Sequence, residues 1–389
     1  MNINWRSFYV FLFLYRCAYS VLAQQVIASL TLLGDSSQYQ LGRIPLLEGD
    51  LTNLSGYFSN TRALATEITE SVGGVFHALF FGNPILINIG FQTIAFVGIV
   101  ALLREVRPGI RIWLAALLML PSFSIWSSIA SKESIIVLAL GIIGALIVRM
   151  YENRTAWRLR ETFAFVIVAL FKTHYLPALL FIIVGTWCAR RVHQKTTLII
   201  VGGIFSLAPL YLFRDLLEDL SFLLIPHFAL SAGSTRPPFW VETYDLFFKA
   251  PQGMFQAFFG PTFSETSHGI LLLGSFIESS AILALLFVVV VVRLPRLPVY
   301  VVAMVGMTIF WIMFANYPLG IQNPGSAIRY RTGYEILIYV AIVVLLSRET
   351  YNVWRGATPA DGLSRSAALG SAPPGSGAGQ RAEDGEPGT

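Results

Sequence analysis

The sequence predicts an all-α, polytopic protein that crosses a membrane about ten times. Its composition carries this prediction: the mean hydropathy is +0.66, 55% of the 389 residues are hydrophobic, and only 13% are charged. Average soluble chains are nearer to about 25% charged, so this chain belongs to the membrane class. The net charge of +5 then describes membrane topology, and we expect no nucleic-acid partner.

Apolar runs long enough to span a bilayer give the individual helices. The first run is read as an anchor, although Val21-Leu-Ala23 also resembles a signal-peptidase site, because apolar residues resume at Val26 and continue to Leu33. Arg16 interrupts this run and must face protein or extend to the interface. The predicted spans lie near residues 8–33, 84–103, 110–129, 133–150, 157–172, 174–190, 196–213, 269–292, 298–316 and 332–348.

Basic residues orient these spans. With the N-terminus in the cytoplasm, 17 of the 27 lysines and arginines are cytoplasmic, nine are external, and Arg16 lies within a span. The positive-inside rule favours this orientation, which also puts the C-terminus in the cytoplasm. Residues 1–355 then form one transmembrane domain, and the Gly-, Ala-, Pro- and Ser-rich residues 356–389 are predicted to be a disordered cytoplasmic tail.

Two long segments lie outside the spans, and both are predicted to be external. The first runs from Gly34 to Asn83 and contains an amphipathic stretch from Thr61 to Phe81. The second runs from Arg214 to His268 and is rich in aromatic residues. Such aromatic segments are typical of helices that lie in the plane of the membrane interface.

The stretch between the last two spans, residues 316–331, combines two arginines with two prolines and two glycines. Pro318, Pro324, Gly320 and Gly325 predict irregular backbone here. Irregular backbone at membrane depth is tolerated only against protein or a water-filled cavity. Paired guanidiniums in such a place form a receptor for phosphate oxygens; the alternative is an ordinary loop with arginines at the level of the lipid headgroups.

Polar residues gather at the external ends of the predicted helices, while the middles of the spans are nearly free of charge. A transporter more often places ionisable groups near the midplane. Glu278, inside the eighth span, is predicted to face the bundle because an acid in lipid is costly. The external residues are Asp35, Lys132, Glu133, Lys172, His174, Glu265, His268, Arg329 and Arg331.

These residues also have structural explanations, which the sequence leaves open. The structural alternatives are a helix cap or Asx-turn for Asp35, a solvated turn for Lys132 and Glu133, an interfacial turn for Lys172 and His174, a helical i,i+4 pair with Glu335 for Arg331, and a hydrogen bond to a neighbouring helix for Glu278.

At these residues the chain resembles bacterial polysaccharide polymerases of the Wzy and EpsG type, which are polytopic membrane glycosyltransferases related to the GT-C class. It departs from them at Lys172-Thr-His174, where an Arg-Pro-His-like sequence is expected, and in lacking the paired acids common after the first span of GT-C enzymes. The similar motifs are Gly34-Asp35-Ser-Ser-Gln-Tyr39, Pro121-Ser…Trp126-Ser-Ser…Lys132-Glu133, Phe171-Lys-Thr-His174, Phe258-Phe-Gly-Pro261-Thr-Phe-Ser-Glu265 and Gly325-Ser-Ala-Ile-Arg329-Tyr-Arg331.

The resemblance implies an enzyme that joins undecaprenyl-pyrophosphate-linked saccharide repeat units on the external face of the bacterial cytoplasmic membrane, to make exopolysaccharide, capsule or O-antigen. Its departing pyrophosphate needs preorganised positive charge, and the acceptor hydroxyl needs a base within reach. The implied partners are membrane lipids, a flippase and a chain-length regulator. The implied residues are Lys132, Lys172, Arg329 and Arg331 for the pyrophosphate, Asp35, His174 and Glu265 as candidate bases, and Tyr39, Glu133 and Glu278 in support.

No metal or cofactor is expected. Cys17 and Cys188 lie in or beside predicted spans and suggest neither a metal site nor a disulfide framework. No other cluster has metal-ligand spacing, and the cations can replace a divalent ion. Two other functions stay open: an O-antigen-ligase-like glycan transferase, which has the same charge pattern, and a flippase or transporter for polyprenyl-linked oligosaccharide.

Overall fold

The computed structural model describes residues 4–30, 33, 35–48, 61–152, 154, 157–222, 236–293, 295 and 297–345. Within these ranges the chain is helical and contains no β-strand, which confirms the predicted all-α class. The predicted tail at 356–389 lies outside the described residues, as does Gly34. The described residues belong to one compact unit, Met1–Ser347.

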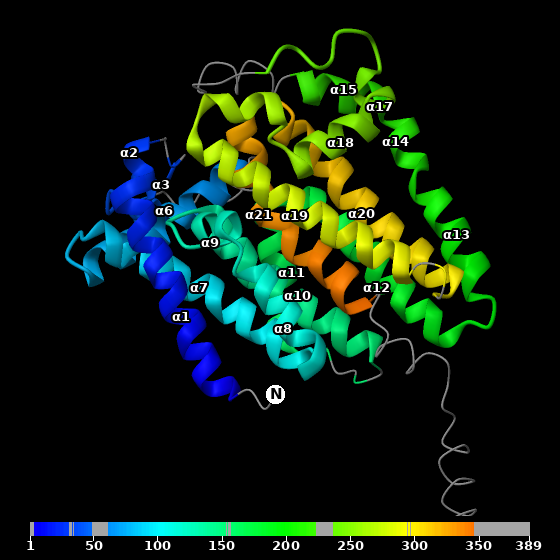
Figure 1. The fold of residues 1–389 in the computed structure, drawn as a ribbon, viewed down its shortest axis with the longest axis horizontal. Coiled ribbons are helices and arrows are strands. Elements are labelled where there is room, and N and C mark those ends of the chain that lie inside the picture. Colours follow the sequence, from blue (N-terminus) through cyan, green and yellow to red (C-terminus); the bar gives the residue numbers. More distant parts are fainter. Residues whose placement is uncertain are drawn as a thin grey trace, which may run out of the picture. The chain divides into compact units, whose positions relative to one another are not determined.

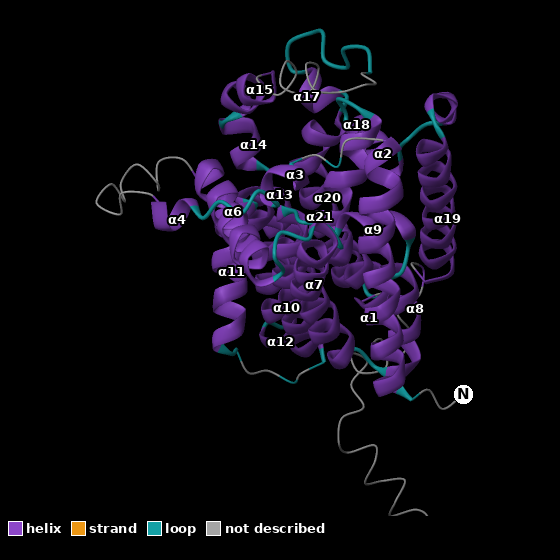
Figure 2. Cartoon of the chain, turned by 90° about the vertical axis from the view of Figure 1, so that its left-hand side faces the viewer, coloured by secondary structure: helices purple, strands orange, loops and turns teal. Residues whose placement is uncertain are grey.

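The longer helices form a bundle, with short helices toward one end of it (Figures 1 and 2). The N-terminal helix α1 begins at the opposite end from α3, α15, α17 and α18 (Figures 1 and 2). In chain order the helices are α1 Trp5–Leu22, a π-helical turn Ala23–Ile27, α2 Ala28–Leu30, α3 Ser36–Tyr39, α4 Pro45–Glu48, α6 Thr61–Leu79, α7 Pro84–Glu105, α8 Pro108–Leu118, α9 Pro121–Trp126, α10 Lys132–Tyr151, α11 Leu159–Phe171, a 3₁₀ turn Thr173–Tyr175, α12 Leu176–Arg191, α13 Lys195–Ser206, α14 Ala208–Leu212, α15 Arg214–Phe222, α17 Asp245–Phe248, α18 Ala250–Phe259, a 3₁₀ segment Phe263–His268, α19 Ile270–Arg293, α20 Val299–Gly320, α21 Pro324–Tyr339 and a π-helical segment Val340–Leu345.

Six helical segments in the described part of the chain are long and apolar enough to cross a membrane. A seventh is counted if α11 and the segment after it form one span, because the two are bent by 118° at the break. The amphipathic stretch noted at Thr61–Phe81 forms helix α6, which ends at Leu79. The six are Trp5–Leu30, Pro84–Glu105, Lys132–Tyr151, Lys195–Leu212, Ile270–Val292 and Val299–Gly320.

The predicted single span at 110–129 is wrong, because two shorter helices, α8 and α9, occupy this stretch. Proline disfavours the helical conformation in the residue before it, and Leu120 accordingly has a ψ of 141° before Pro121. Pro121 then begins α9 at its first position, where the missing N–H of proline costs nothing.

The centre of the bundle is α10, which is buried along most of its length and packs against α7, α11, α12 and α21. Helices α7 and α10 run parallel, since Asn88 near the start of α7 contacts Ala130 just before α10, and Glu105 at the end of α7 contacts Arg149 in the last turn of α10. They approach so closely that a Cβ added to Gly141 would lie 2.3 Å from the carbonyl oxygen of Gly98. Small residues allow this approach.

The junction between α20 and α21 is more regular than the sequence suggests. Helix α20 continues through Pro318 to Gly320 and α21 begins at Pro324, so only residues 321–323 separate them. The Asn323 side chain accepts a hydrogen bond from Ser326 N at 2.6 Å and caps the new helix, with Pro324 at its first position. The predicted irregular backbone over 316–331 is therefore wrong in extent.

Because the junction is short, both arginines lie on a regular helix, and helical geometry sets their directions. Both Arg329 and Arg331 lie on α21, two positions apart. Residues two apart on an α-helix are separated by about 200° around the axis. The two guanidiniums consequently lie on opposite sides of α21.

Candidate functional site

Five of the residues singled out by sequence meet in one cluster, here called the Arg329 cluster: Asp35, Tyr39, Lys132, Glu133 and Arg329. Arg329 Nη2 lies 3.3 Å from Asp35 Oδ2, and Arg329 Nε lies 3.8 Å from Glu133 Oε1. The Tyr39 hydroxyl donates to Asp35 Oδ2 at 3.5 Å. The cluster thus joins the short helix after the first span, the start of α10 and the second turn of α21.

Local sequence explains why α10 presents its first residues to this cluster. The Ser131 side chain caps the helix by accepting from Ser134 N at 3.3 Å. Lys132 and Glu133 are then the first two helical residues, and an acid in the first turn is favoured by the helix dipole. The solvated turn considered for Glu133 is wrong, because its side chain is buried; its favourable place in the first turn of α10 coexists with the contact to Arg329.

Arg329 is mostly enclosed, whereas its partner Asp35 is half exposed. The side chains of Arg329 and Glu133 are 15% and 3% exposed, whereas that of Asp35 is 52% exposed. Among described residues the guanidinium makes one hydrogen bond, the one to Asp35. Burial lowers the pKa of Arg329, but the carboxylates of Glu133 and Asp35 outweigh it and the pKa is raised, so the cation persists at any physiological pH.

Tyr39 remains a neutral phenol in the cluster. Its burial raises the pKa of the phenol, and the carboxylates of Asp35 and Glu133 raise it further. The hydroxyl therefore keeps its proton and serves as a donor to Asp35.

Helix α6 contributes polar groups that the sequence reasoning missed. Lys132 Nζ donates to Thr66 Oγ1 at 2.6 Å. Gln38 Nε2, next to Tyr39, donates to Glu70 Oε1. The available signal was the amphipathic pattern of α6, which repeats polar residues at helical spacing on one face.

Lys172 lies beside the Arg329 cluster, while His174 contacts another helix. The Lys172 ammonium sits over the Tyr330 ring at 4.8 Å from its centroid, and the Arg329 guanidinium lies 5.7 Å from the same centroid. Tyr330 thus contacts both cations. His174 Nε2 lies 3.4 Å from Asn316 Oδ1 on α20.

Arg331 belongs to a second, buried cluster on the other side of α21. Its side chain is 1% exposed, and its Nε lies 2.6 Å from Glu335 Oε1. Nη1 donates to the carbonyl of Phe258 at 2.9 Å and to Ser279 Oγ at 2.5 Å. The predicted i,i+4 pair of Arg331 and Glu335 is confirmed, and protein groups surround this guanidinium.

Glu278 joins the same buried cluster from α19, which confirms that it faces the bundle. It accepts hydrogen bonds from the backbone N–H of Ser122 at 2.9 Å and from the Ser122 hydroxyl. Its Oε1 also lies 3.6 Å from Arg331 Nη2, which donates to Ser122 Oγ at 3.0 Å. Helices α9, α19 and α21 are tied together through this one serine.

Glu265 lies apart from the Arg329 cluster. It forms an ion pair with Arg236, a residue that the sequence reasoning did not single out. The contact is bidentate: Arg236 Nε lies 2.5 Å from Glu265 Oε1, and Arg236 Nη2 lies 3.0 Å from Glu265 Oε2. Arg236 Nη1 also donates to the carbonyls of Gly320 and Ile321. Burial raises the pKa of Glu265, but the bonds from Arg236 and from Thr262 N outweigh it and lower the pKa, which makes Glu265 a weak base.

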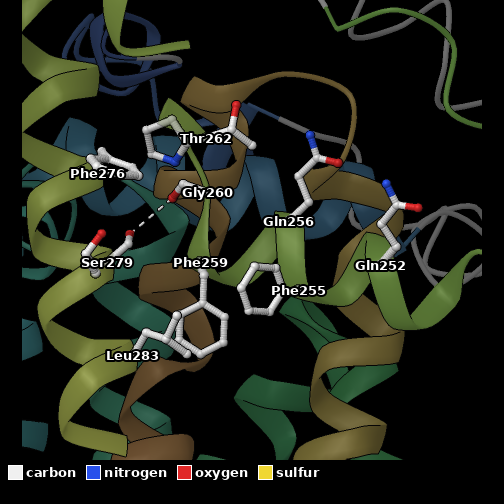
Figure 3. Close-up of a pocket in the computed structure, with 11 residues that line it drawn as sticks. Gln252, Phe255, Gln256, Phe259, Gly260, Thr262, Phe276, Ser279 and Leu283 are labelled. Carbon is white, nitrogen blue, oxygen red and sulfur yellow. Dashed lines mark hydrogen bonds between the residues drawn. The ribbon is translucent and has the colours of Figure 1, made fainter. Parts of the chain in front are cut away.

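A cleft of about 310 Å³ opens between α18 and α19 (Figure 3), and no residue of the Arg329 cluster lines it. Ser279 in its wall donates to the Gly260 carbonyl at 3.1 Å and accepts from Arg331 Nη1, so Arg331 lies directly behind the wall. The lining is largely aromatic and apolar: Gln252, Phe255, Gln256, Phe259, Gly260, Pro261, Thr262, Phe276, Ser279, Ser280 and Leu283.

The described residues include no group of three or more His, Cys, Asp or Glu side chains arranged to hold a metal ion. The functional groups of the Arg329 cluster are carboxylates, a guanidinium, an ammonium and a phenol. These groups bind anions, orient hydroxyls and move protons.

Compared with family models, curated proteins and solved structures, the chain matches none of them. The geometry of its own residues is what supports a function.

Proposed function

We propose that the chain is a GT-C-like membrane glycosyltransferase with about ten spans, acting on saccharide repeat units linked to undecaprenyl pyrophosphate. The reaction would take place at the external face of the bacterial cytoplasmic membrane and would lengthen a polysaccharide. The observation that carries this proposal is the Arg329 cluster. It places a permanently charged guanidinium and an exposed carboxylate side by side, although they are 294 residues apart in sequence.

In this proposal Asp35 is the base and Arg329 receives the leaving group. The acceptor hydroxyl attacks the anomeric carbon and loses its proton to the Asp35 carboxylate. The bond from that carbon to the pyrophosphate oxygen breaks, and the electron pair leaves with the pyrophosphate. Arg329 and the neighbouring Lys172 stabilise that developing charge, while Glu133 holds Arg329 in place.

The resting contact between Arg329 and Asp35 fits this order of events. An incoming pyrophosphate competes with Asp35 for the guanidinium, because phosphate oxygens match its planar donors. Displacing Asp35 frees a carboxylate beside the bound substrate. Asp35 is the best placed of the three candidate bases, since Glu265 is held by Arg236 and His174 faces Asn316.

We place the polyprenyl chain in the cleft between α18 and α19. Its wall is lined by Phe255, Phe259 and Phe276, which offer apolar surface to a hydrocarbon. Arg331 behind that wall connects the cleft to α21, the helix that carries Arg329. Lipids, a flippase and a chain-length regulator are the partners this function implies.

The deciding experiment measures polymer formation by membranes supplied with lipid-linked repeat units extracted from a strain lacking this gene. Arg329→Gln should reduce the rate by about 100-fold or more, because it removes preorganised charge at the leaving group. Arg329→Lys keeps the charge but loses the two-pronged geometry, and should fall between Arg329→Gln and the wild type. Asp35→Asn should match Arg329→Gln.

The matched control is Arg43→Gln, which removes an exposed arginine that follows α3 and lies outside the cluster. It should leave polymer formation unchanged. Normal polymer levels in both Arg329→Gln and Asp35→Asn would refute the proposed site. Accumulation of full-length lipid-linked chains, instead of single repeats, would point to the ligase-like transferase.

A transport function is the second candidate, and the buried charges of Arg331, Glu278 and Glu335 favour it. Ionisable groups inside a membrane bundle are typical of transport pathways. Vesicles containing only this protein distinguish the two functions. Movement of a fluorescent polyprenyl-linked saccharide across them, without any polymer, would support transport and contradict the glycosyltransferase.

A further inference from the structure

A buried amide on α7 connects two segments that carry the Arg329 cluster. Asn88 is fully buried, and its Oδ1 accepts two hydrogen bonds. One comes from the backbone N–H of Ala130 at 2.8 Å, and the other from Gln40 Nε2 at 2.9 Å. Asn88 Nδ2 donates in turn to Gln24 Oε1 at 3.1 Å. The Asn88 side chain thus forms hydrogen bonds with the backbone of the segment before α10 and with a side chain of the segment after α3.

The two segments held by Asn88 are those that present the charged groups. Gln40 directly follows α3, whose first turn adjoins Asp35 and whose last residue is Tyr39. Ala130 lies just before the capping residue of α10, and α10 opens with Lys132 and Glu133. No sequence motif marked Asn88, because its role depends on contacts 42 and 48 residues away.

The segment with Gln40 is also held from a second side. His77 on α6 forms a hydrogen bond of 2.9 Å with the Gln40 carbonyl. Gln40 Nε2 approaches Gln24 Oε1 at 3.4 Å, so Gln24, Gln40 and Asn88 form a closed polar triangle inside the bundle. Gln24 and Gln40 are half-buried, whereas Asn88 is fully buried, so an arrangement that broke these bonds would leave the Asn88 amide unpaired at a cost in free energy.

We propose that Asn88 is a positioning residue that sets the spacing between Asp35 and the Lys132–Glu133 pair. This inference rests on the proposed function, since the spacing matters only if the Arg329 cluster is the site. Helix α7 is one of the long spans packed against α10, so Asn88 is a fixed point between the two segments. Misplacing a reacting group by about 1 Å can cost about 100-fold in rate.

The test compares three variants. Asn88→Leu keeps the bulk but removes both hydrogen bonds from Ala130 and Gln40. Asn88→Asp retains an acceptor for both, because burial favours the neutral carboxyl, whose hydroxyl replaces Nδ2 as the donor to Gln24 Oε1. The matched control is Gln92→Leu, one turn further along α7, because Gln92 is also fully buried and its Nε2 has no hydrogen-bond partner among the described residues.

Two readouts are needed. The first is amide hydrogen exchange of the peptides covering residues 35–42 and 127–133, measured on the purified full chain in detergent. The second is the kcat and the KM of polymer formation from extracted lipid-linked repeat units. Asn88→Leu should accelerate exchange in both peptides and lower kcat by about 10- to 100-fold, with a smaller change in KM. Asn88→Asp should recover protection and most of kcat, and Gln92→Leu should resemble the wild type in both readouts.

The outcomes separate this inference from the proposed function. If Asn88→Leu exchanges faster but keeps its kcat while Arg329→Gln is inactive, Asn88 is a structural residue only and the inference is refuted. Equal losses in Asn88→Leu and Gln92→Leu would refute it as well. If Arg329→Gln and Asp35→Asn are both active, the proposed function is refuted, and the inference is refuted with it, because the spacing then sets no catalytic geometry.

Discussion

Arg329 and Arg331 are two residues apart, yet their surroundings assign them different tasks. Arg329 makes one hydrogen bond among the described residues, and its partner Asp35 is half exposed. Arg331 is 1% exposed and is bound by Glu335, Phe258, Ser279 and Ser122. A guanidinium with that many protein partners stabilises the fold, and one with few is available to a ligand.

Replacing Arg331 alone should destabilise the protein strongly. Arg331→Met leaves Glu335 and Glu278 buried without their cation, and breaking a buried ion pair in this way costs about 3–5 kcal/mol. Thermal unfolding of the detergent-purified protein should show a large drop in Tm. The double variant Arg331→Met/Glu335→Leu replaces the pair by apolar groups and should recover most of the loss. A wild-type Tm for Arg331→Met would contradict the stabilising role.

At the scale of elements, the parallel contact between α7 and α10 carries the site. Helix α10 begins in the Arg329 cluster with Lys132, and Asn88 near the start of α7 bonds to Ala130 just before α10, so the relative position of the two helices bears on the geometry of the cluster. Gly98 and Gly141 bring the two backbones into contact. Association of helices in lipid depends on such packing, because burial from water supplies no driving force there.

Gly141→Val should separate these helices, because its new Cβ would overlap the backbone of Gly98. Overpacking costs about 1–3 kcal/mol, so a lower Tm and a broadened size-exclusion peak are expected. Gly202→Val is the matched control, since no atom lies within 4 Å of the position of a Cβ on Gly202. If both valine variants behaved alike, the close contact of α7 with α10 would not be important for stability.

At the scale of the whole described unit, ionic clusters occur at both ends of α10. The Arg329 cluster is at its start, while Arg149 in its last turn pairs with Glu161 at 2.5 Å and with Glu105 at 3.2 Å. Twenty residues of helix span about 30 Å, which is close to the thickness of a bilayer core. The two clusters are thus about one bilayer core apart.

This spacing predicts opposite accessibility of the two ends. In a background with Cys17→Ala and Cys188→Ala, Leu41→Cys and Arg154→Cys introduce thiols at exposed positions near the two ends. A membrane-impermeant maleimide should label Leu41→Cys in intact spheroplasts and Arg154→Cys only after permeabilisation. The reverse pattern would invert the proposed orientation, and labelling of both thiols in intact spheroplasts would place the two ends on one side.

Composition and periodicity were sufficient for the fold class and for most of the long helices, because burial in lipid demands continuous apolar runs. The sequence also singled out four members of the site, because charged side chains near membrane segments are rare and cost free energy to bury. They are Asp35, Lys132, Glu133 and Arg329. Proline patterns were less informative: Pro121 broke a predicted span, whereas Pro318 did not break α20.

The sequence by itself determined an all-helical chain whose charged residues gather at the ends of apolar helices. Only the tertiary structure decided that Arg329 meets Asp35, that Arg331 meets Ser122, and that Arg236 pairs with Glu265. The physical reason is that apolar content is a local property of each segment. Pairing of charges depends on which helices pack together and on the rotation of each about its axis, which close packing of the whole bundle determines.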